Sequence, residues 1–197
     1  MQRRVWWSVA AVAALALVWS PPAGAGDPPA APKVKVGDDA PDFFLRDLEG
    51  NMVRLSDYAF KGPESPRRVK RKVLLDFFRT DCKPCMKELP QVVEFHHKHK
   101  DRVQVIMIAL LEEEDGRGRL DRWLAANKQP FPVLVDAYEN VAKKYIVEGD
   151  TVQLPSMFLI DENATVRARL VGLQDNLENE LKGALEGGAP APIPVNR

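Results

Sequence analysis

Cysteine and histidine are scarce in this sequence, and neither sign of charge is in excess. The 197 residues include two cysteines and three histidines, and 28 lysines and arginines stand against 28 aspartates and glutamates. A nucleic-acid-binding surface needs a large basic excess, so a nucleic-acid partner is excluded. The two cysteines lie three positions apart, where a bridge would close almost no chain and add little stability. We therefore expect the two cysteines to be chemically reactive rather than to form a stabilising disulfide.

A long hydrophobic run is also missing, apart from one near the N-terminus. Residues 1–4 carry two arginines, residues 5–18 are almost wholly apolar and residues 21–25 are mostly small, which is the three-part pattern of a secretory signal peptide. The apolar run falls short of the roughly 20 residues that cross a bilayer comfortably. We predict a signal peptide over residues 1–25 and a periplasmic or otherwise extracytoplasmic location. An uncleaved leader that tethers the domain to the membrane is the alternative.

Two segments rich in proline and small residues flank the rest of the chain. Residues 26–35 are predicted to be a Pro/Ala-rich linker and residues 187–197 a flexible tail. Removal of the leader leaves 26 basic against 28 acidic residues, because it contains two arginines and no acid. Residues 36–186 are long enough to form one domain that buries its own core.

Strand and helix patterns alternate within this domain. Apolar runs and alternation predict strands, and helical periodicity predicts helices between them. The expected strands cover residues 43–46, 52–55, 73–78, 103–109, 131–135, 156–161 and 166–171, and the expected helices cover residues 83–99, 120–127, 139–145 and 177–185. This order predicts an α/β fold with a mixed central sheet flanked by helices.

The pair Cys82-Lys83-Pro84-Cys85 stands where a strand gives way to a helix. Unpaired backbone N–H groups and the dipole at a helix N-terminus favour an anion, so the pKa of the Cys82 thiol should be lowered. Thiolate is the species that attacks disulfides. Cys85 lies one turn along and is placed to resolve a mixed disulfide. The positive charge of Lys83 should favour the thiolate further, and Pro84 is tolerated in the first helical turn.

Metal binding is the competing interpretation of two cysteines at this spacing. A structural zinc ion needs four ligands, but the sequence has no second cysteine pair, and its histidines lie several turns away at the far end of the same helix. We therefore predict no metal site and no cofactor. The three histidines, His96, His97 and His99, are expected to decorate a solvated helix end, with metal capture by His96 and His99 left open.

The segment VLLDFFRTDCKPCMKELP, residues 73–90, resembles the active-site segment of the thioredoxin superfamily, in particular its extracytoplasmic TlpA/ResA branch. Asp76 matches the buried acid at the foot of the thioredoxin site. Glu88 matches the carboxylate typical of the branch, and Pro90 matches the proline that kinks the active-site helix.

Two further segments carry the same resemblance. Residues 154–161 resemble the cis-proline loop of the family and the strand after it, with Pro155 as the proline. Residues 40–43 and the hairpin that follows resemble the N-terminal addition of the branch. The resemblance extends over about residues 36–186 and implies a thioredoxin-like fold with an N-terminal β-hairpin addition.

One residue departs from the family pattern. A tryptophan usually precedes the first cysteine, whereas Asp81 stands there in this chain. A negative charge beside Cys82 opposes thiolate formation, although Asp is also a good helix cap. These opposing effects leave the redox potential undetermined.

Four residues join the cysteines as candidates for the site. Asp76 is an acid within an apolar strand, so burial should raise its pKa and suit it to proton transfer with Cys85; a surface-facing strand position is the alternative. Glu88 is expected to tune the thiols or, alternatively, to be a solvated helix acid. Pro155 is expected to be cis and to leave the backbone of Leu154 open to an extended substrate segment; an ordinary trans proline is the alternative.

The leading prediction is an exported thioredoxin-like protein-disulfide oxidoreductase acting on protein thiols and disulfides. The resemblance implies a reductant, for example in cytochrome c maturation, supplied with electrons by a membrane thiol reductase. A peroxiredoxin-like thiol peroxidase is the second hypothesis, but Thr80 lies two residues before the cysteine rather than three. A non-catalytic copper-binding chaperone is the third, because copper(I) favours thiolates.

Overall fold

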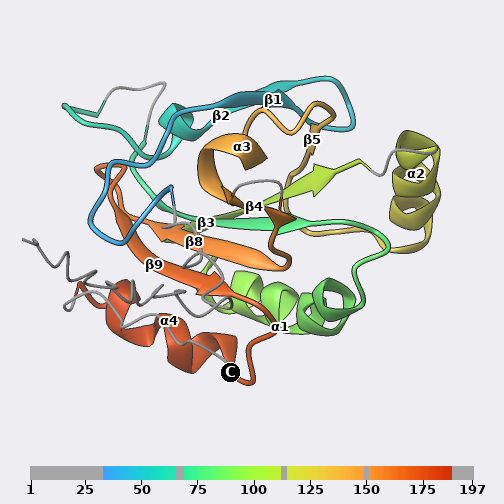
Figure 1. Cartoon of the computed structure of the whole chain (residues 1–197). Coiled ribbons are helices and arrows are strands. Elements are labelled where there is room, and N and C mark those ends of the chain that lie inside the picture. Colours follow the sequence, from blue (N-terminus) through green and yellow to red (C-terminus); the bar gives the residue numbers. More distant parts are fainter. Residues whose placement is uncertain (1–32, 65–68, 112–114, 149–150, 188–197) are drawn as a thin grey trace, which may run out of the picture.

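The computed structural model describes residues 33–64, 69–111, 115–148 and 151–187, so the predicted leader lies outside the described residues. A seven-stranded sheet forms the middle of the molecule (Figure 1). In spatial order its strands are β2 (Met52–Arg54), β1 (Phe44–Arg46), β5 (Val133–Asp136), β4 (Val103–Leu110), β3 (Lys72–Phe78), β8 (Ser156–Ile160) and β9 (Val166–Val171). Strands β5, β4 and β3 are parallel, and the other pairings are antiparallel. The predicted mixed sheet is confirmed, and the N-terminal hairpin extends it beyond β5.

Helices cover both faces of the sheet. The elements outside it are the 3-10 helix η1 (Leu55–Asp57), α1 (Lys83–His99), α2 (Gly116–Ala126), α3 (Ala142–Tyr145), α4 (Leu177–Leu185) and a small hairpin of β6 (Val147–Glu148) and β7 (Thr151–Val152). Helices α1 and α4 lie together on one face, and α3 lies on the other (Figure 1). Across the described ranges, no helix is long and apolar enough to span a membrane.

Strand β3 divides the core between the two faces and places the candidate acid. Its side chains alternate, since successive residues of a strand point to opposite faces. Leu74 and Phe78 belong to the cluster that packs against α1 and α4, whereas Val73, Leu75 and Phe77 belong to the cluster beneath α3. Asp76 has the same parity as Leu74 and Phe78, so it faces α1, the helix that carries the cysteines.

Helix α2 begins at Gly116, four residues before the expected start at residue 120. Its first turn contains two glycines, which normally disfavour a helix interior. Gly116 is needed for a close approach, because a Cβ there would lie 3.0 Å from the Leu111 Cβ. Arg117 and Asp121 then form an i,i+4 ion pair at 2.9 Å. Packing and charge therefore extend the helix beyond its apolar pattern.

Three other local features differ from the expectation. Helix α3 covers only the last four of the seven residues expected to be helical, and the β6–β7 hairpin was not predicted. Val34, placed in the predicted linker, is only 3% exposed and packs into the core cluster beneath α3. The packed domain therefore includes Val34, and the linker boundary predicted at residue 35 is too late.

Tyr145 of α3 fixes the N-terminal segment to the sheet. Its side chain is fully buried, its hydroxyl donates a hydrogen bond to the Pro41 carbonyl at 2.6 Å, and its ring packs against Phe77 and Phe158. We expect Tyr145→Phe to lower the free energy of unfolding by about 1–2 kcal/mol, because the part-buried Pro41 carbonyl loses its donor. Urea unfolding measures this effect. Tyr138→Phe, at a side chain 79% exposed, is the control, and an equal loss in both variants would contradict the role of the hydrogen bond.

Candidate active site

The two cysteines form a disulfide at the N-terminus of α1. The Cys82 and Cys85 sulfur atoms are bonded at 2.02 Å. Cys82 is the N-cap residue of α1, and its Sγ accepts a hydrogen bond from the backbone N–H of Cys85 at 3.2 Å. Cys85 is buried, whereas Cys82 is partly exposed. The sulfur that a partner can reach is therefore the one at the helix terminus, as the sequence indicated.

Two buried carboxyl groups lie on the core side of this helix. Asp76 is 4% exposed and Glu88 is 1% exposed, so the surface-facing and solvated alternatives for these acids are both wrong. Burial, with a smaller contribution from the charge of Glu88, raises the pKa of Asp76 to about 8. Burial raises the pKa of Glu88 to about 7, although the backbone N–H of Gln174 lowers it by donating a hydrogen bond to Oε1 at 3.0 Å. Among the described residues, the Asp76 Oδ1 and the Glu88 Oε2 have no hydrogen-bond partner.

Burial brings the pKa values of both acids near neutrality, and the charge of Glu88 contributes to the shift of Asp76. Two interacting carboxyl groups share their protons, so the pair can hold one proton and one charge over the same pH range. A group with a pKa near the working pH can both accept and donate a proton. The pair is therefore suited to proton exchange with a neighbouring buried thiol.

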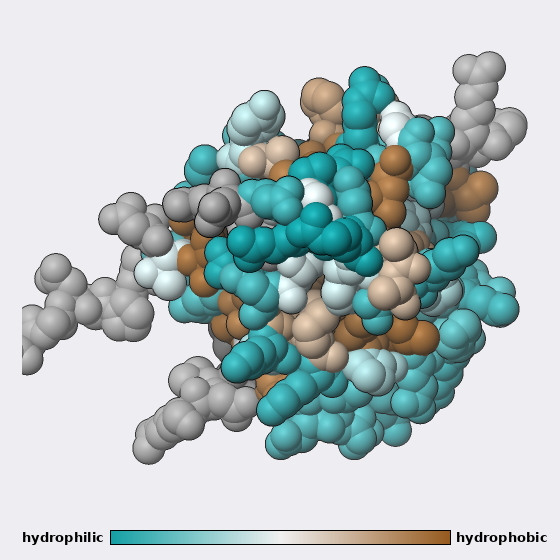
Figure 2. Space-filling view, turned by 90° about the vertical axis from the view of Figure 1, so that its right-hand side faces the viewer, coloured by the Kyte–Doolittle hydropathy of each residue, from teal (hydrophilic) through white to brown (hydrophobic). Residues whose placement is uncertain are grey.

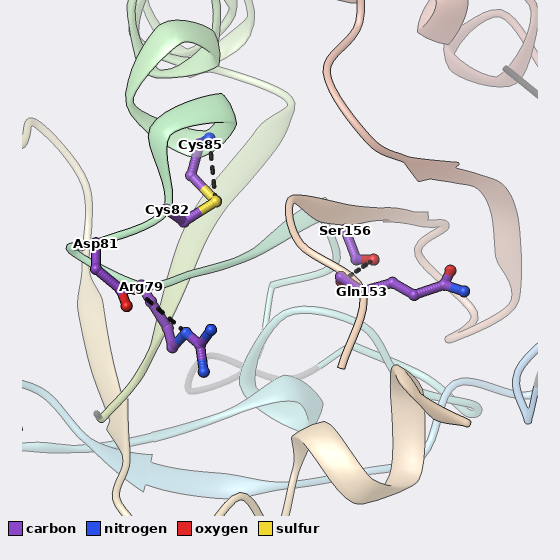
Figure 3. The surroundings of a disulfide bond; sticks show 6 residues. All are labelled: Arg79, Asp81, Cys82, Cys85, Gln153 and Ser156. Carbon is purple, nitrogen blue, oxygen red and sulfur yellow. Dashed lines mark hydrogen bonds and ion pairs between the residues drawn. A yellow bond between two sulfur atoms is a disulfide. The ribbon is translucent and has the colours of Figure 1, made fainter. Parts of the chain in front are cut away.

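The proline loop lies opposite the disulfide. The Leu154–Pro155 peptide bond is cis, as predicted. Strand β8 begins at the next residue, Ser156, which pairs with Phe77 near the end of β3, and its hydroxyl donates a hydrogen bond to the Gln153 carbonyl at 2.8 Å. Figure 3 shows this loop facing the first turn of α1. The pairing of β3 with β8 thus brings the cysteines and the proline loop together, although they lie about 70 residues apart in the sequence.

Asp81 does not cap the helix, because Cys82 holds that position. Its carboxylate instead forms an ion pair with Arg79, with 3.4 Å between the Arg79 Nε and the Asp81 Oδ1. The sequence reasoning overlooked Arg79, although a charged residue directly after an apolar strand was a usable signal. It also overlooked Gln174, whose backbone contact with Glu88 depends on how the loop before α4 packs.

The histidines differ from the expectation most clearly at His99, and the ring of His96 is also half-buried against Phe131. His99 is 5% exposed, and its Nε2 lies 2.9 Å from the Glu178 Oε2 of α4. Its Nδ1 lies 3.2 Å from an Arg102 nitrogen. The expectation of a solvated histidine is wrong here because α4 covers this end of α1. In the part of the chain that the structure describes, no three His, Cys, Asp or Glu residues are grouped as a metal site.

The surface around the disulfide is mostly polar. The β3–α1 connection lies on the right in Figure 1, the side that faces the viewer in Figure 2. This face is largely hydrophilic and is interrupted by small apolar patches (Figure 2). A disulfide at a helix N-terminus, two buried acids on the core side of that helix and a cis-proline loop facing its first turn define a thiol–disulfide oxidoreductase of thioredoxin-like fold.

Comparison with known proteins agrees with this class. The model of the AhpC/TSA family matches residues 36–169, and the chain belongs to this family. Thiol-disulfide oxidoreductase ResA of Bacillus thuringiensis subsp. konkukian is 32% identical over 152 residues, which cover 76% of this chain and 79% of ResA. ResA of Geobacillus kaustophilus is also 32% identical, over 76% of this chain and 78% of its own length.

A solved structure supports the same assignment. A Chlorobium tepidum protein assigned as thiol:disulfide interchange protein DsbE superimposes with a TM-score of 0.63 at 27% identity, covering 78% of this chain and 97% of that chain. The curated relatives are named for thiol–disulfide exchange, which favours this chemistry over the peroxidase and copper-chaperone alternatives.

Proposed function

We propose that the chain is an exported reductant of protein disulfides that works through Cys82 and Cys85. The observation that carries the proposal is the disulfide at the N-terminus of α1, together with two buried acids, one on α1 and one on the β3 face toward α1, whose pKa values are raised toward neutrality. The helix terminus favours a thiolate on Cys82 in the reduced protein. The acids supply a proton acceptor for the less accessible Cys85.

The reaction begins from the dithiol. The Cys82 thiolate attacks one sulfur of a substrate disulfide, a new S–S bond forms, and the other substrate sulfur leaves as a thiolate that takes a proton. The Cys85 thiol then loses its proton to the Asp76–Glu88 pair and attacks the Cys82 sulfur, which releases the second substrate sulfur as a thiolate that takes a proton from water. Two electrons pass to the substrate, and the protein ends as the disulfide seen in the structure.

Substrate placement is assigned to the loop that ends at Pro155. Leu154 precedes β8 at the edge where β3 ends, so an extended polypeptide can run beside its backbone and bring a cysteine to Cys82. Backbone pairing is largely independent of sequence, so it suits an enzyme that acts on more than one protein disulfide.

The cellular context follows from the segment that precedes the domain. The pattern of residues 1–25 supports export, and an uncleaved leader would instead tether the same domain to a membrane. An oxidising compartment would leave the pair as a disulfide, so sustained reduction requires a thiol reductase in the membrane. Reduced haem-attachment cysteines of apocytochromes c are the proposed product.

A competition between two oxidants tests the proposal. The reduced protein is expected to transfer its two electrons to a disulfide-linked peptide, giving one disulfide and two peptide thiols, while consuming hydrogen peroxide far more slowly. Thiol titration and peroxide assays measure both reactions on the same sample. Faster turnover with peroxide would contradict the proposal and favour a peroxidase. A midpoint potential as high as about −120 mV, typical of a strong disulfide oxidant, would contradict the reductant direction.

A further inference from the structure

We propose that Arg79 is a positioning residue for the thiol exchange: it offsets the charge of Asp81 and so allows the adjoining Cys82 to ionise. The inference rests on the proposed function, because it concerns the reactivity of the same cysteine. It explains how Asp81 can stand beside Cys82, where an acid without a counter-charge would oppose thiolate formation.

A tight turn brings the two charges together. The backbone N–H of Cys82 donates a hydrogen bond to the Arg79 carbonyl at 3.2 Å, which closes a four-residue turn between β3 and α1. Within this turn the side chains of Arg79 and Asp81 meet, with 3.4 Å between Nε and Oδ1. Figure 3 shows the Asp81 carboxylate directed toward Arg79 and away from the sulfur of Cys82.

The environment of Arg79 and Asp81 allows their charges to act on the Cys82 sulfur. The side chains of Arg79 and Asp81 are 37% and 50% exposed, so water screens them only in part. The Arg79 Nε is buried and makes no hydrogen bond with the described residues. Its interaction with Asp81 is therefore electrostatic rather than a directed hydrogen bond.

The charged residues next to Cys82 in the sequence are Asp81 and Lys83. Lys83 is exposed, and its positive charge favours the Cys82 thiolate. Asp76 and Glu88 lie on the buried side of the helix. In the facing loop neither labelled residue is ionisable: the side chain of Gln153 points away from the disulfide, and the hydroxyl of Ser156 bonds to the Gln153 carbonyl (Figure 3). Asp81 is thus the acid nearest to Cys82 in sequence, and Arg79 is the base that neutralises it.

The test is a double-mutant cycle on reduced protein, read by the rate of alkylation of Cys82 across pH. Arg79→Gln is expected to slow alkylation at pH 7 about threefold and to move the pH profile to higher pH, because Asp81 is left uncompensated. Asp81→Asn is expected to speed alkylation by a similar factor. The double variant should return close to the original rate, because the two substitutions remove opposite charges whose effects on Cys82 cancel.

Three controls separate this role from a structural one. Arg79→Lys keeps the charge and should restore the rate. Arg117→Gln removes the same charge from an exposed ion pair on α2 and should leave the profile unchanged. The equilibrium constant of the dithiol with glutathione should shift about threefold toward the disulfide in Arg79→Gln, and high salt should reduce every difference.

The proposal fails if Arg79→Gln has no effect, or if the double variant stays as slow as Arg79→Gln alone. If Arg79→Gln does not fold, Asp81→Asn and Arg79→Lys still test the proposal. Unchanged alkylation of Cys82 in Asp81→Asn would overturn it, because the charge of Asp81 would then need no offset. Alkylation needs no protein substrate. A failure to reduce disulfides would therefore reject the proposed function while leaving the role of Arg79 separately measurable.

Discussion

Replacing Cys82 with serine is expected to lower the rate of disulfide reduction at least about a thousandfold. A serine hydroxyl does not ionise near neutral pH and forms no disulfide, so the attacking species disappears. Cys85 cannot take over the attack, because it is only 5% exposed and lies behind the helix terminus. Reduction of a disulfide-linked peptide by the pre-reduced variant measures the loss.

The matched variant is Cys85→Ser, which should react once and then stop. Its Cys82 thiolate still attacks, but nothing resolves the mixed disulfide, so a covalent adduct with the peptide accumulates. Non-reducing electrophoresis and mass measurement detect the adduct. If the adduct formed in Cys82→Ser instead, the assigned order of attack would be reversed; if it formed in neither variant, the exchange mechanism itself would be wrong.

The second large effect concerns stability, because Asp76 is an acid without a hydrogen-bond partner for its Oδ1 in the described core. Asp76→Asn is expected to raise the free energy of unfolding at pH 9 by about 3 kcal/mol, since the variant no longer buries a carboxylate. At pH 4 the two proteins should differ little, because Asp76 is then protonated in the folded state. Urea unfolding at a series of pH values measures the difference.

The sign of this pH dependence follows from proton binding. The pKa of Asp76 is raised from 3.8 to about 8 in the folded protein, so between these values the folded state holds a proton that the unfolded state has released. Stability therefore falls as pH rises across this window, by up to about 1.4 kcal/mol per pH unit for one group. Glu88, whose pKa is raised to about 7, adds to the fall over its own narrower range.

Asp136 supplies the control for this experiment. It is also buried, at 2% exposure, but its Oδ2 accepts hydrogen bonds from the backbone N–H groups of Val141 and Ala142. Asp136→Asn should therefore destabilise the protein, because one acceptor that ties α3 to β5 is weakened. If both substitutions shifted stability in the same direction, the contrast between a satisfied and an unsatisfied buried acid would not hold.

Much of the fold could be predicted because local pattern and global structure agree. The sequence predicts the apolar strand β3, the helix that follows it and the cysteine pair between them. Residues 83–99 form a helix with the predicted bounds. The burial of Asp76 was predicted from its place in an apolar strand. These features depend on periodicity and on neighbours in the chain, which a sequence contains directly.

The features that were missed depend on contacts between distant segments. His99 looks like part of a polar helix end until α4 covers it and Glu178 pairs with it. The β6–β7 hairpin has only two residues in each strand, too few for an alternating pattern. It is held by a buried ion pair between Glu148 and Arg169 of β9. No local propensity encodes such partners, so only the assembled fold reveals them.

The pairing of β3 with β8 has a consequence for how the site persists over time. Asp76 lies beside Met157 and Phe77 beside Ser156 in one antiparallel ladder, and the cysteine turn and Pro155 are the immediate continuations of these two strands. A slip of one residue would turn the side chains of β8 to the opposite face. The pairing of β3 with β8, in the most deeply buried part of the sheet, thus fixes the distance between the Cys82 sulfur and the proline loop. The two halves of the site can separate only when the core opens cooperatively, so their alignment lasts as long as the fold itself.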